Sequence, residues 1–524
     1  MLIAAFNKDD AESLGLVKLD VLGLRSLGVV QGAVELHQSA TGERLEIDDI
    51  ALDDPKVYDL ITAGETLALF QVESPGQMAL LAKHQPRDFQ ALIAQIALLR
   101  PGPIQGNAVH PFVRRARGLE AITYSHPSLE PILRDTHGVL LYQESVMEIV
   151  HNFAGFSWAR TDRFRKLMGK FRSSSEMEAL RDEFVIGARA THPDCALETI
   201  DEIFTSCAKF AGYGFPRSHS AAFAKTVYQT AFLKRYHAAA YMAAVLEHHP
   251  GMYSRQTIVH EAQRHGVTFL PPSLEHSVFG FALEPITTPT GDSHAVRFPI
   301  ESIVGVGADA ARLLLLERAA QPFDTLEDLY ARAPVQHDVL ELLGKAGALD
   351  HFGARRDELW RLKDLRGAYG APGRGAPLLE TPTDLPDLAW LSPLELSAWD
   401  AATTGASTGA HVIAFHRPQL ERAGVTPISR LAGERGTVAG VRIAFQRPPT
   451  ARGFTFITLE DESGRVQVIV PPKVYPIFET VLRSSCLVVS GRVQRVGAWR
   501  GLVLEMVRVF EPHALESQKI GIGV

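Results

Sequence analysis

The chain has 524 residues, of which 46% are hydrophobic and 22% are charged, and its formal net charge is −7. This length is enough for three or four domains that each bury a core of their own. The sequence contains no run of about 18 apolar residues, and acidic residues follow the first few positions closely. We therefore expect neither a membrane span nor a secretory signal, and we predict a cytoplasmic protein.

The net charge and the cysteines indicate which ligands and which thiol state to expect. An acidic chain argues mildly against nucleic acid, but phosphate binding depends on the local field, so an acidic whole can carry a basic site. The three cysteines, Cys195, Cys207 and Cys486, form no CxxC pair and no metal-ligand spacing. They indicate reduced, buried thiols.

The first half of the chain is typical of a helical protein. Residues 11–25 predict a short helix followed by an apolar strand around Asp20, and residues 26–250 predict helices interrupted by Pro/Gly turns. The stretch from Val227 to Leu246 is the clearest helix, because its apolar residues recur on one face.

The second half changes from helices to strands. Residues 251–295 are rich in turn formers, and residues 297–352 predict helices around two small glycine-containing hairpins. Residues 366–412 are rich in Gly, Pro, Ala and Thr and indicate a loosely packed linker. Residues 436–511 alternate apolar and polar side chains, which predicts short strands that close a small barrel or sheet.

Asp20 is a carboxylate within an apolar strand, which is costly to bury unless it is paired or binds a metal ion. Lys18 precedes it by two residues and so projects from the same face of the strand. The pair is compatible with a salt bridge or with a site for a metal ion and a phosphate, and a structural hydrogen bond is the plain alternative.

Two stretches could offer cations to phosphate. Arg100 stands at a rigid Pro-Gly-Pro turn, where a planar guanidinium suits phosphate but also suits an ordinary surface turn. Residues 160–172 carry a local charge of +5, and Arg165, Lys166 and Lys170 within them could face a triphosphate. The same run is also typical of a solvated helix face.

The segment from Gly212 to Ser220 places glycines, aromatic rings and polar groups directly before a long helix. Arg217, Ser218 and His219 could contact a phosphate or a base at the helix N-terminus. Alternatively, Ser218 or Ser220 is simply the N-cap.

Three further features suggest contact with DNA. Gly305 and Gly307 precede a helical segment in the manner of a helix-hairpin-helix, and residues 344–350, which include Lys345, are a candidate second copy. The strands around 454–470 fit an OB-fold, a barrel that commonly binds single strands through basic and aromatic faces. Its candidate contacts are Phe456, Arg465 and Arg492, although Phe456 could equally be a core residue.

Two apparent enzyme motifs lack the context that their chemistry needs. Residues 405–409 match GxSxG but follow a Thr/Ala-rich stretch rather than a strand, so no nucleophile elbow is expected. His260 and His265 are one residue too far apart for HExxH and would not share a helix face as zinc ligands.

The chain resembles the α subunit of bacterial DNA polymerase III, a C-family DNA polymerase. The resemblance covers nearly the whole chain and rests on long segments in family order: LGLVKLDVLGLR (14–25), LFQVESPGQM (69–78), IALLRPGPIQ (96–105), GVLLYQESVMEI (138–149), RFRKLMGKF (163–171) and KFAGYGFPRSHSAAFA (209–224). The stretch at 249–262 and the end of the chain shortly after the OB-like segment resemble the error-prone, translesion members of the family.

The resemblance implies a multidomain, mainly α fold with a C-terminal OB-fold. The implied order is the end of the palm at 1–25, fingers at 26–250, a helix-hairpin-helix region at 251–355, a linker at 356–430, the OB-fold at 431–512 and a tail at 513–524. Asp20 corresponds to the third metal-binding aspartate of the palm, which would hold Mg²⁺. The implied nucleotide contacts are Lys18, Arg100, Arg165, Lys166, Lys170, Arg217, Ser218 and His219.

One departure from the family pattern changes the expected activity. No PDxDxD segment, which carries the other two aspartates of the family, occurs in these 524 residues. We therefore expect a chain without the PHP domain and most of the palm, inactive alone, whose partners are primer-template DNA, dNTP and a second chain with the missing palm. Contact with the sliding clamp would be indirect, through accessory mutagenesis proteins. A non-catalytic DNA-binding remnant and a scaffold in a mutagenesis complex are the alternatives.

Overall fold

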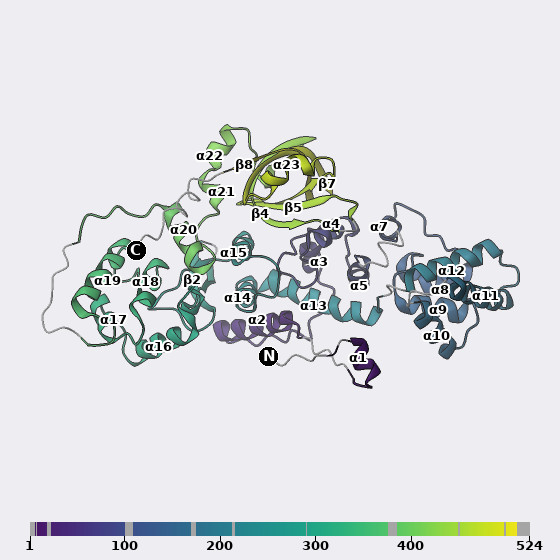
Figure 1. Ribbon diagram of the computed structural model, residues 1–524, viewed down its shortest axis with the longest axis horizontal. Coiled ribbons are helices and arrows are strands. Elements are labelled where there is room, and N and C mark those ends of the chain that lie inside the picture. Colours follow the sequence, from purple (N-terminus) through teal and green to yellow (C-terminus); the bar gives the residue numbers. More distant parts are fainter. Residues whose placement is uncertain are drawn as a thin grey trace.

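The computed structural model describes residues 6, 8–17, 23–99, 108–168, 174–211, 215–289, 291–375, 385–448, 451–496 and 499–510. The molecule is elongated, with a helical body in the middle, a second helical body at one end, a third at the other end, and a β-barrel beside the middle (Figure 1). Among the described helices, none has the length and apolarity that crossing a membrane requires. The prediction of a mainly helical chain with a C-terminal barrel is confirmed.

The central body contains the largest hydrophobic core, in which Tyr58, Tyr228 and Tyr241 are fully enclosed. It is built from α2 (Arg25–Thr41), α3 (Pro55–Thr62), α4 (Pro75–His84), α5 (Phe89–Leu98), α7 (Val109–Ala116), α13 (Arg217–Tyr236), α14 (Ala238–His248) and α15 (Arg255–Arg264). The short helix α1 (Lys8–Ser13) precedes them. The same core continues through Val267 and Phe269, so these residues pack with the helices before the predicted boundary at 250.

The continuous helix predicted from Val227 to Leu246 is wrong in one respect. The chain leaves helical geometry at His237, where φ is −131° and ψ is 46°, and α14 starts at the next residue. The break turns α14 into the core, and every residue from Ala240 to Leu246 is buried. A helix that is apolar on all sides needs neighbours on all sides, which one straight helix at this position would not find.

The end body has its own core of clustered phenylalanines. Phe184 lies 5.6 Å from Phe204 and 6.1 Å from Phe164, measured between ring centroids. The elements are η1 (Pro127–Leu129), α8 (Glu130–Leu133), η2 (Arg134–Thr136), α9 (Gln143–Asn152), α10 (Trp158–Met168), α11 (Ser174–Thr191) and α12 (Leu197–Ala211). Cys207 is buried in this core, whereas Cys195 is half-buried, so the prediction of buried thiols is wrong for Cys195. Cys486 is buried in the barrel, and all three cysteines are free.

The body at the opposite end joins a small sheet to a helical cluster. Strands β1 (Phe269–Leu270), β2 (Ala282–Thr288) and β3 (Gly291–Arg297) form a sheet in the order β1-β3-β2. A separate core then unites η3 (Ile300–Ser302), α16 (Gly307–Ala320), α17 (Leu326–Arg332), α18 (His337–Lys345) and α19 (Arg355–Tyr369).

The stretch predicted as a linker carries helices of its own, in addition to most of α19. They are α20 (Pro393–Thr404), α21 (Val412–Phe415), α22 (Arg417–Arg422) and η4 (Ile428–Arg430). Helix α20 starts at a complete capping box, in which Ser392 and Glu395 satisfy each other's backbone N–H groups. Composition alone did not indicate this helix, because the stretch around it is rich in Gly, Pro, Ala and Thr.

The C-terminal domain is a closed five-stranded barrel in the order β4-β5-β6-β8-β7. Its elements are β4 (Arg435–Gln446), β5 (Thr455–Asp461), β6 (Gly464–Val470), α23 (Tyr475–Leu482), β7 (Cys486–Val496) and β8 (Trp499–Val509). Alternate residues of β6, Val466, Val468 and Val470, point into the barrel core. This alternation is the pattern from which the strands were predicted.

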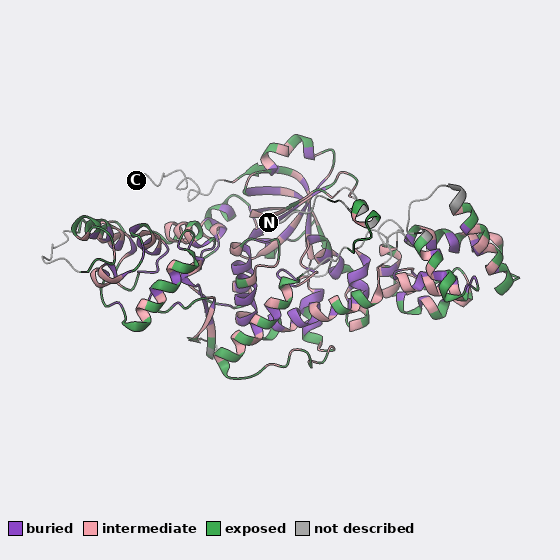
Figure 2. Ribbon diagram, turned by 60° about the horizontal axis from the view of Figure 1, so that its bottom comes forward, coloured by how far each residue is buried: buried purple, intermediate pink, exposed green. Residues whose placement is uncertain are grey.

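The barrel packs against the central body through the outer face of β5. Thr458 and Glu460 point away from the barrel core, yet they are 7% and 1% exposed. Figure 2 shows the strands on this side as largely buried. A strand buried on both faces means that the barrel packs directly against the helices along β5.

Candidate nucleic-acid interface and the barrel junction

Four predicted site residues, Lys18, Asp20, Arg100 and Lys170, lie outside the described residues. The others fall in three places: the end body, the first turn of α13, and the regions of the glycine hairpins and the barrel. The structure therefore describes the surroundings of part of the predicted nucleotide site.

The cations of α10 are largely paired with acidic residues. The Asp162 carboxylate lies 3.0 Å from the Arg165 guanidinium and 2.7 Å from the Lys166 ammonium. Hydrogen bonds from these two groups lower the pKa of Asp162, first from Lys166 and then from Arg165. Arg160 is paired with Glu183. A phosphate would have to compete with Asp162 for both cations. This exchange of partners would cost little free energy, because ion pairs between exposed side chains are weak.

The N-terminus of α13 is occupied by a carboxylate. The backbone N–H of Arg217 donates to both oxygens of Glu144, at 3.1 and 3.0 Å, and the N-cap residue is Pro216. An anion is the expected occupant of a helix N-terminus. The N-cap interpretation of Ser218 and Ser220 is therefore wrong.

The predicted residues of this turn face different neighbours. The Arg217 guanidinium donates to Gln90 and Asp135 and lies over the ring of Tyr142. Ser218 is exposed, and the exposed His219 ring contacts Phe223 at 4.0 Å between centroids. The turn thus joins the central and end bodies.

The two predicted glycine hairpins differ in their surroundings. Gly305 and Gly307 have φ values of +93° and +70°, and the space beside Gly307 is open. Gly307 begins α16, so its N–H belongs to a helical turn without internal carbonyl partners. By contrast, a Cβ on Gly347 would lie 2.0 Å from the guanidinium of Arg355, and Lys345 is near Glu341 at 3.7 Å. The first hairpin is open at Gly307, while the second is filled by protein.

The three predicted contacts on the barrel also differ. Phe456 is half-buried on β5, and Arg465 is 14% exposed and donates to the Glu261 carboxylate at 2.6 Å. Arg492 is 67% exposed, with Glu505 3.8 Å away. Arg465 therefore belongs to the contact between the barrel and α15.

This contact contains a buried charge cluster that sequence reasoning missed. Glu261 of α15 receives Lys234 from α13, Arg264 from its own helix and Arg465 from β6. Lys234 is fully buried, and Glu261 is 2% exposed. Burial alone would raise the pKa of Glu261, but the charges of Arg465, Lys234 and Arg264 together with His265 hold it well below its usual range. The carboxylate thus links two helices to the barrel.

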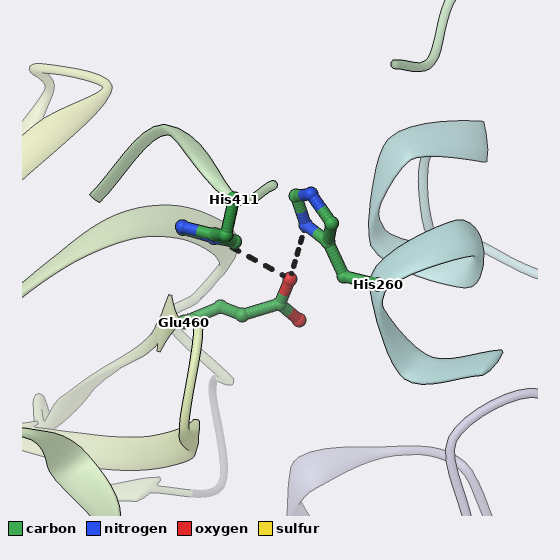
Figure 3. Close-up of side chains that lie close together, drawn as sticks. All are labelled: His260, His411 and Glu460. Carbon is green, nitrogen blue, oxygen red and sulfur yellow. Dashed lines mark hydrogen bonds and ion pairs between the residues drawn. The ribbon is translucent and has the colours of Figure 1, made fainter. Parts of the chain in front are cut away.

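Next to it, His260, His411 and Glu460 meet from three distant parts of the chain (Figure 3). The Nδ1 of His260 lies 3.0 Å and the Nε2 of His411 lies 3.8 Å from the same oxygen of Glu460. Burial, followed by the nearby positive groups, lowers the pKa of His411 to about 2, so its ring is neutral. Within the described residues, this is the group whose ligand atoms all lie within 4.8 Å of one another.

The hydrogen bonds around the rings decide against a metal ion. The side-chain oxygen of Gln256 accepts the backbone N–H of Ser407, which fixes the orientation of the Gln256 amide. The amide nitrogen therefore faces His260 Nε2, at 2.8 Å, and donates to it, so His260 Nε2 is an acceptor. His411 Nδ1 likewise accepts the N–H of Ile413. Both protons must then stand on the nitrogens that face Glu460, whereas a metal ligand needs a bare nitrogen there. His260 is hydrogen-bonded to Glu460, and His411 lies beside the same carboxylate; we name this group the lock.

The discounted sequence motifs have structural roles at the same place. Ser407 of the GxSxG stretch contacts Gln256 of α15, and Gln263 donates to Thr408. His265 contacts Glu261 at 3.3 Å, so it does not share a partner with His260. A pattern search could not find the lock, because His411 and Glu460 follow His260 by 151 and 200 positions.

A cavity of about 290 Å³ remains between the barrel and the helices. Its polar lining includes Arg264, His265, Arg465, Gln467 and Arg500, and Trp499 forms part of its wall. The outer face of β5 and β6 is therefore shared between this cavity and the lock.

Comparison with known proteins gives the domains in order. Residues 26–192 match the family described as the bacterial DNA polymerase III alpha subunit finger domain, residues 266–359 match a helix-hairpin-helix motif, and residues 435–502 match an OB-fold nucleic acid binding domain. The first range covers α2 to α11 and ends before α12–α15, the second covers the sheet and most of its helical cluster, and the third covers most of the barrel.

Whole-chain relatives agree with the domain matches. The chain is 39% identical over 513 residues to a protein of Mycobacterium bovis, a match that covers 96% of this chain and 46% of the relative. It is 35% identical to a protein of Nocardia farcinica (97% and 45%) and 38% identical to one of Corynebacterium efficiens (94% and 45%). All three are named error-prone DNA polymerase, and the chain spans less than half of their length. By its finger, helix-hairpin-helix and OB-fold domains, the chain belongs to the bacterial C-family of DNA polymerases, the family of the DNA polymerase III α subunit.

Proposed function

We propose that this chain supplies the fingers and the DNA-binding domains of an error-prone DNA polymerase, which adds deoxynucleotides to a primer during synthesis across damaged DNA. The single observation that carries this proposal is the alignment of three domains in family order with relatives of that name. Its substrates are dNTP and primer-template DNA.

In this proposal the fingers and the end of the palm neutralise the incoming triphosphate. The contributing residues are Lys18, Arg100, Arg165, Lys166, Lys170, Arg217, Ser218 and His219. In the structure Asp162 pairs with Arg165 and Lys166, and Glu144 receives the first N–H of α13. These carboxylates act as internal substitutes for phosphate, and a bound triphosphate displaces them. Such an exchange of anions keeps the cations satisfied in both states.

The family implies Mg²⁺, and the donors of this chain do not suit a two-ion centre. Such a centre needs carboxylates that hold two ions about 3.5–4 Å apart. Asp20 is one carboxylate, and no PDxDxD segment accompanies it in these 524 residues. We therefore propose that a polypeptide of these residues is inactive alone and that a second polypeptide supplies the remaining carboxylates.

Duplex DNA is proposed to contact the hairpin at Gly305 and Gly307 and Lys345 of the second hairpin, and the barrel is proposed to take single strands. The proposed barrel contacts are Phe456 and Arg492; Arg465, which the sequence also predicted, already donates to Glu261. Clamp contact is proposed to pass through accessory mutagenesis proteins. The absence of a PDxDxD segment favours one alternative, a DNA-binding component without chemistry.

The test is primer extension by the purified chain with Mg²⁺ and dNTP, beside a DNA-binding titration. Asp20→Ala tests the proposed metal ligand, and Asp49→Ala, a change of an exposed acid outside the predicted site, is the matched control. We expect DNA binding without extension, and extension when a polypeptide with the palm is added, abolished by Asp20→Ala alone. Extension by the chain alone, lost in Asp20→Ala, would overturn the proposed inactivity. Absence of DNA binding would overturn the proposed function.

A further inference from the structure

The cavity between the barrel and the central body is lined by segments that meet only in the folded chain. They are the turn after α3, parts of α4 and α15, the turn between β5 and β6, β6 itself and the start of β8. Figure 1 shows the barrel beside α3 and α4. The cavity of about 290 Å³ is close to the lower end of the usual range for small-molecule sites, about 300–1,000 Å³, and such sites commonly lie between domains.

Three arginines line this cavity: Arg264 at the end of α15, Arg465 on β6 and Arg500 on β8. Arg264 donates through Nη2 alone, to Glu261 at 2.7 Å and to Glu460 at 3.5 Å. Arg465 donates through Nη1 to Glu261. Within the described residues, the other side-chain N–H groups of these arginines have no hydrogen-bond acceptor.

Two of these nitrogens are buried as well as unpartnered. They are Nη1 of Arg264 and Nε of Arg500, which come from a helix and from a barrel strand. A buried N–H group of a cation without an acceptor is costly, and folded proteins rarely leave one so. Water would accept these protons without balancing the charge, whereas an anion would do both.

The buried acids near the cavity do not balance the cations. Lys234, Arg264 and Arg465 share the two carboxylates of Glu261 and Glu460, so one of three positive charges is left over. Surroundings of low polarity strengthen the attraction between such a charge and an anion.

Arg500 adds a further positive charge, because no ion pair involves it in the part of the chain that the structure describes. Glu65, the other acid of the lining, is 55% exposed and lies 3.9 Å from His265. The cavity therefore has an excess of positive charge that an anion would neutralise.

One wall of the cavity is an aromatic ring. Trp499 is half-buried, and a Cβ on Gly501 would collide with its indole, so the ring lies against the backbone of β8. Gln467, whose backbone pairs with Gly501, lines the same cavity. A ring supported in this way favours contact with another flat ring, and the forked guanidinium groups suit the oxygens of phosphate.

We propose that this cavity binds a nucleotide, whose phosphate groups contact Arg264, Arg465 and Arg500 and whose base lies against Trp499. The ligand touches the helices and the barrel at once, so its binding strengthens the packing of the barrel on the central body. None of the described residues proposed above for the triphosphate of the incoming dNTP lines the cavity. The inference thus goes beyond the proposed function and does not depend on it.

The test is calorimetric titration of the full chain with pyrophosphate and with adenosine diphosphate, in the presence of EDTA. We expect both probes to bind, and the diphosphate nucleotide to bind more tightly, because its base adds contact with Trp499. Arg500→Gln should lower the affinity for both probes about tenfold or more, as expected for one lost hydrogen bond to a charged group. Arg508→Gln, an exposed change on the same strand outside the cavity lining, is the matched control.

Two further measurements test the base contact and the packing. Trp499→Leu should lower the affinity for adenosine diphosphate and leave that for pyrophosphate unchanged. In the wild-type chain, adenosine diphosphate should raise hydrogen-exchange protection in α15 and β6, which both line the cavity. Arg500→Gln should melt like wild type without ligand, because Arg500 makes no ion pair with the described residues.

Four outcomes would overturn the inference. The first is that the wild-type chain binds neither probe. The second is that Arg500→Gln binds like wild type while Arg165→Gln with Lys166→Gln binds weakly, which would place the anion at the proposed triphosphate contacts and would support the proposed function. The third is equal affinity for both probes that Trp499→Leu leaves unchanged, which would exclude a nucleotide. The fourth is that Arg500→Gln, and not Arg508→Gln, weakens binding of a dT oligonucleotide, which would make DNA the occupant. Failure of the chain to bind DNA would overturn the proposed function and leave this inference standing.

Discussion

Replacing Glu261 with glutamine removes a buried carboxylate while keeping the shape of its side chain. Lys234 would lose its counterion but keep two hydrogen bonds, to the carbonyls of Glu65 at 2.8 Å and Leu67 at 3.0 Å. Breaking one partner of a buried pair costs about 3–5 kcal/mol. Since the lysine keeps its carbonyls and Arg264 keeps Glu460 at 3.5 Å, we expect the lower end, about 3 kcal/mol.

Native-state hydrogen exchange is the suitable assay, because a chain of several domains has no single free energy of unfolding. Protection should fall in α15 and β6, the two elements that Glu261 joins, and much less in the end body. Glu65→Gln is the matched control, because that side chain is 55% exposed and 3.9 Å from its partner His265. Its effect should stay within about 0.5 kcal/mol.

A second variant tests the cause of the loss. Lys234→Met combined with Glu261→Gln removes the buried cation together with its counterion, and protection should recover in part, since no lysine charge is left uncompensated. Equal loss of protection in Glu261→Gln and Glu65→Gln would refute the view that this carboxylate holds the barrel to the helices. Failure of the double variant to recover would refute the assignment of the loss to the lysine.

Three more outcomes follow from the structure. The pKa of His411 is about 2 in the fold against an ordinary value of 6.5, so its contribution to stability is present above pH 6.5 and is lost as the pH falls towards 2. Between pH 7.5 and 5.5, melting of His411→Asn should therefore depend less on pH than melting of wild type. Zn²⁺ or EDTA should leave the melting temperature unchanged, because protonated nitrogens face Glu460, and a rise with Zn²⁺ would contradict the assigned protons. Gly307→Ala should lower the stability by about 1 kcal/mol, because its backbone is left-handed. Gly305→Ala should lower it more, since its Cβ would lie 2.9 Å from Leu342. Equal melting temperatures of the two variants would argue against that contact.

The sequence by itself determined the family, the order of the domains and the fold class. Those properties follow from local signals: the 3.6-residue and two-residue periodicities and the long family segments, each contained within a few tens of residues. The barrel strands were predicted because alternation is imposed by the pleat of each strand separately.

Only the tertiary structure showed which face of the barrel packs against the helices. Local patterns do not say which face of a strand meets another domain, so Arg465 was predicted as a DNA contact although it bonds to Glu261. The lock joins His260 to Glu460 over 200 positions. Burial and the pairing of charges depend on residues that meet only after folding, and for that reason the role of each cation could be assigned only from the structure.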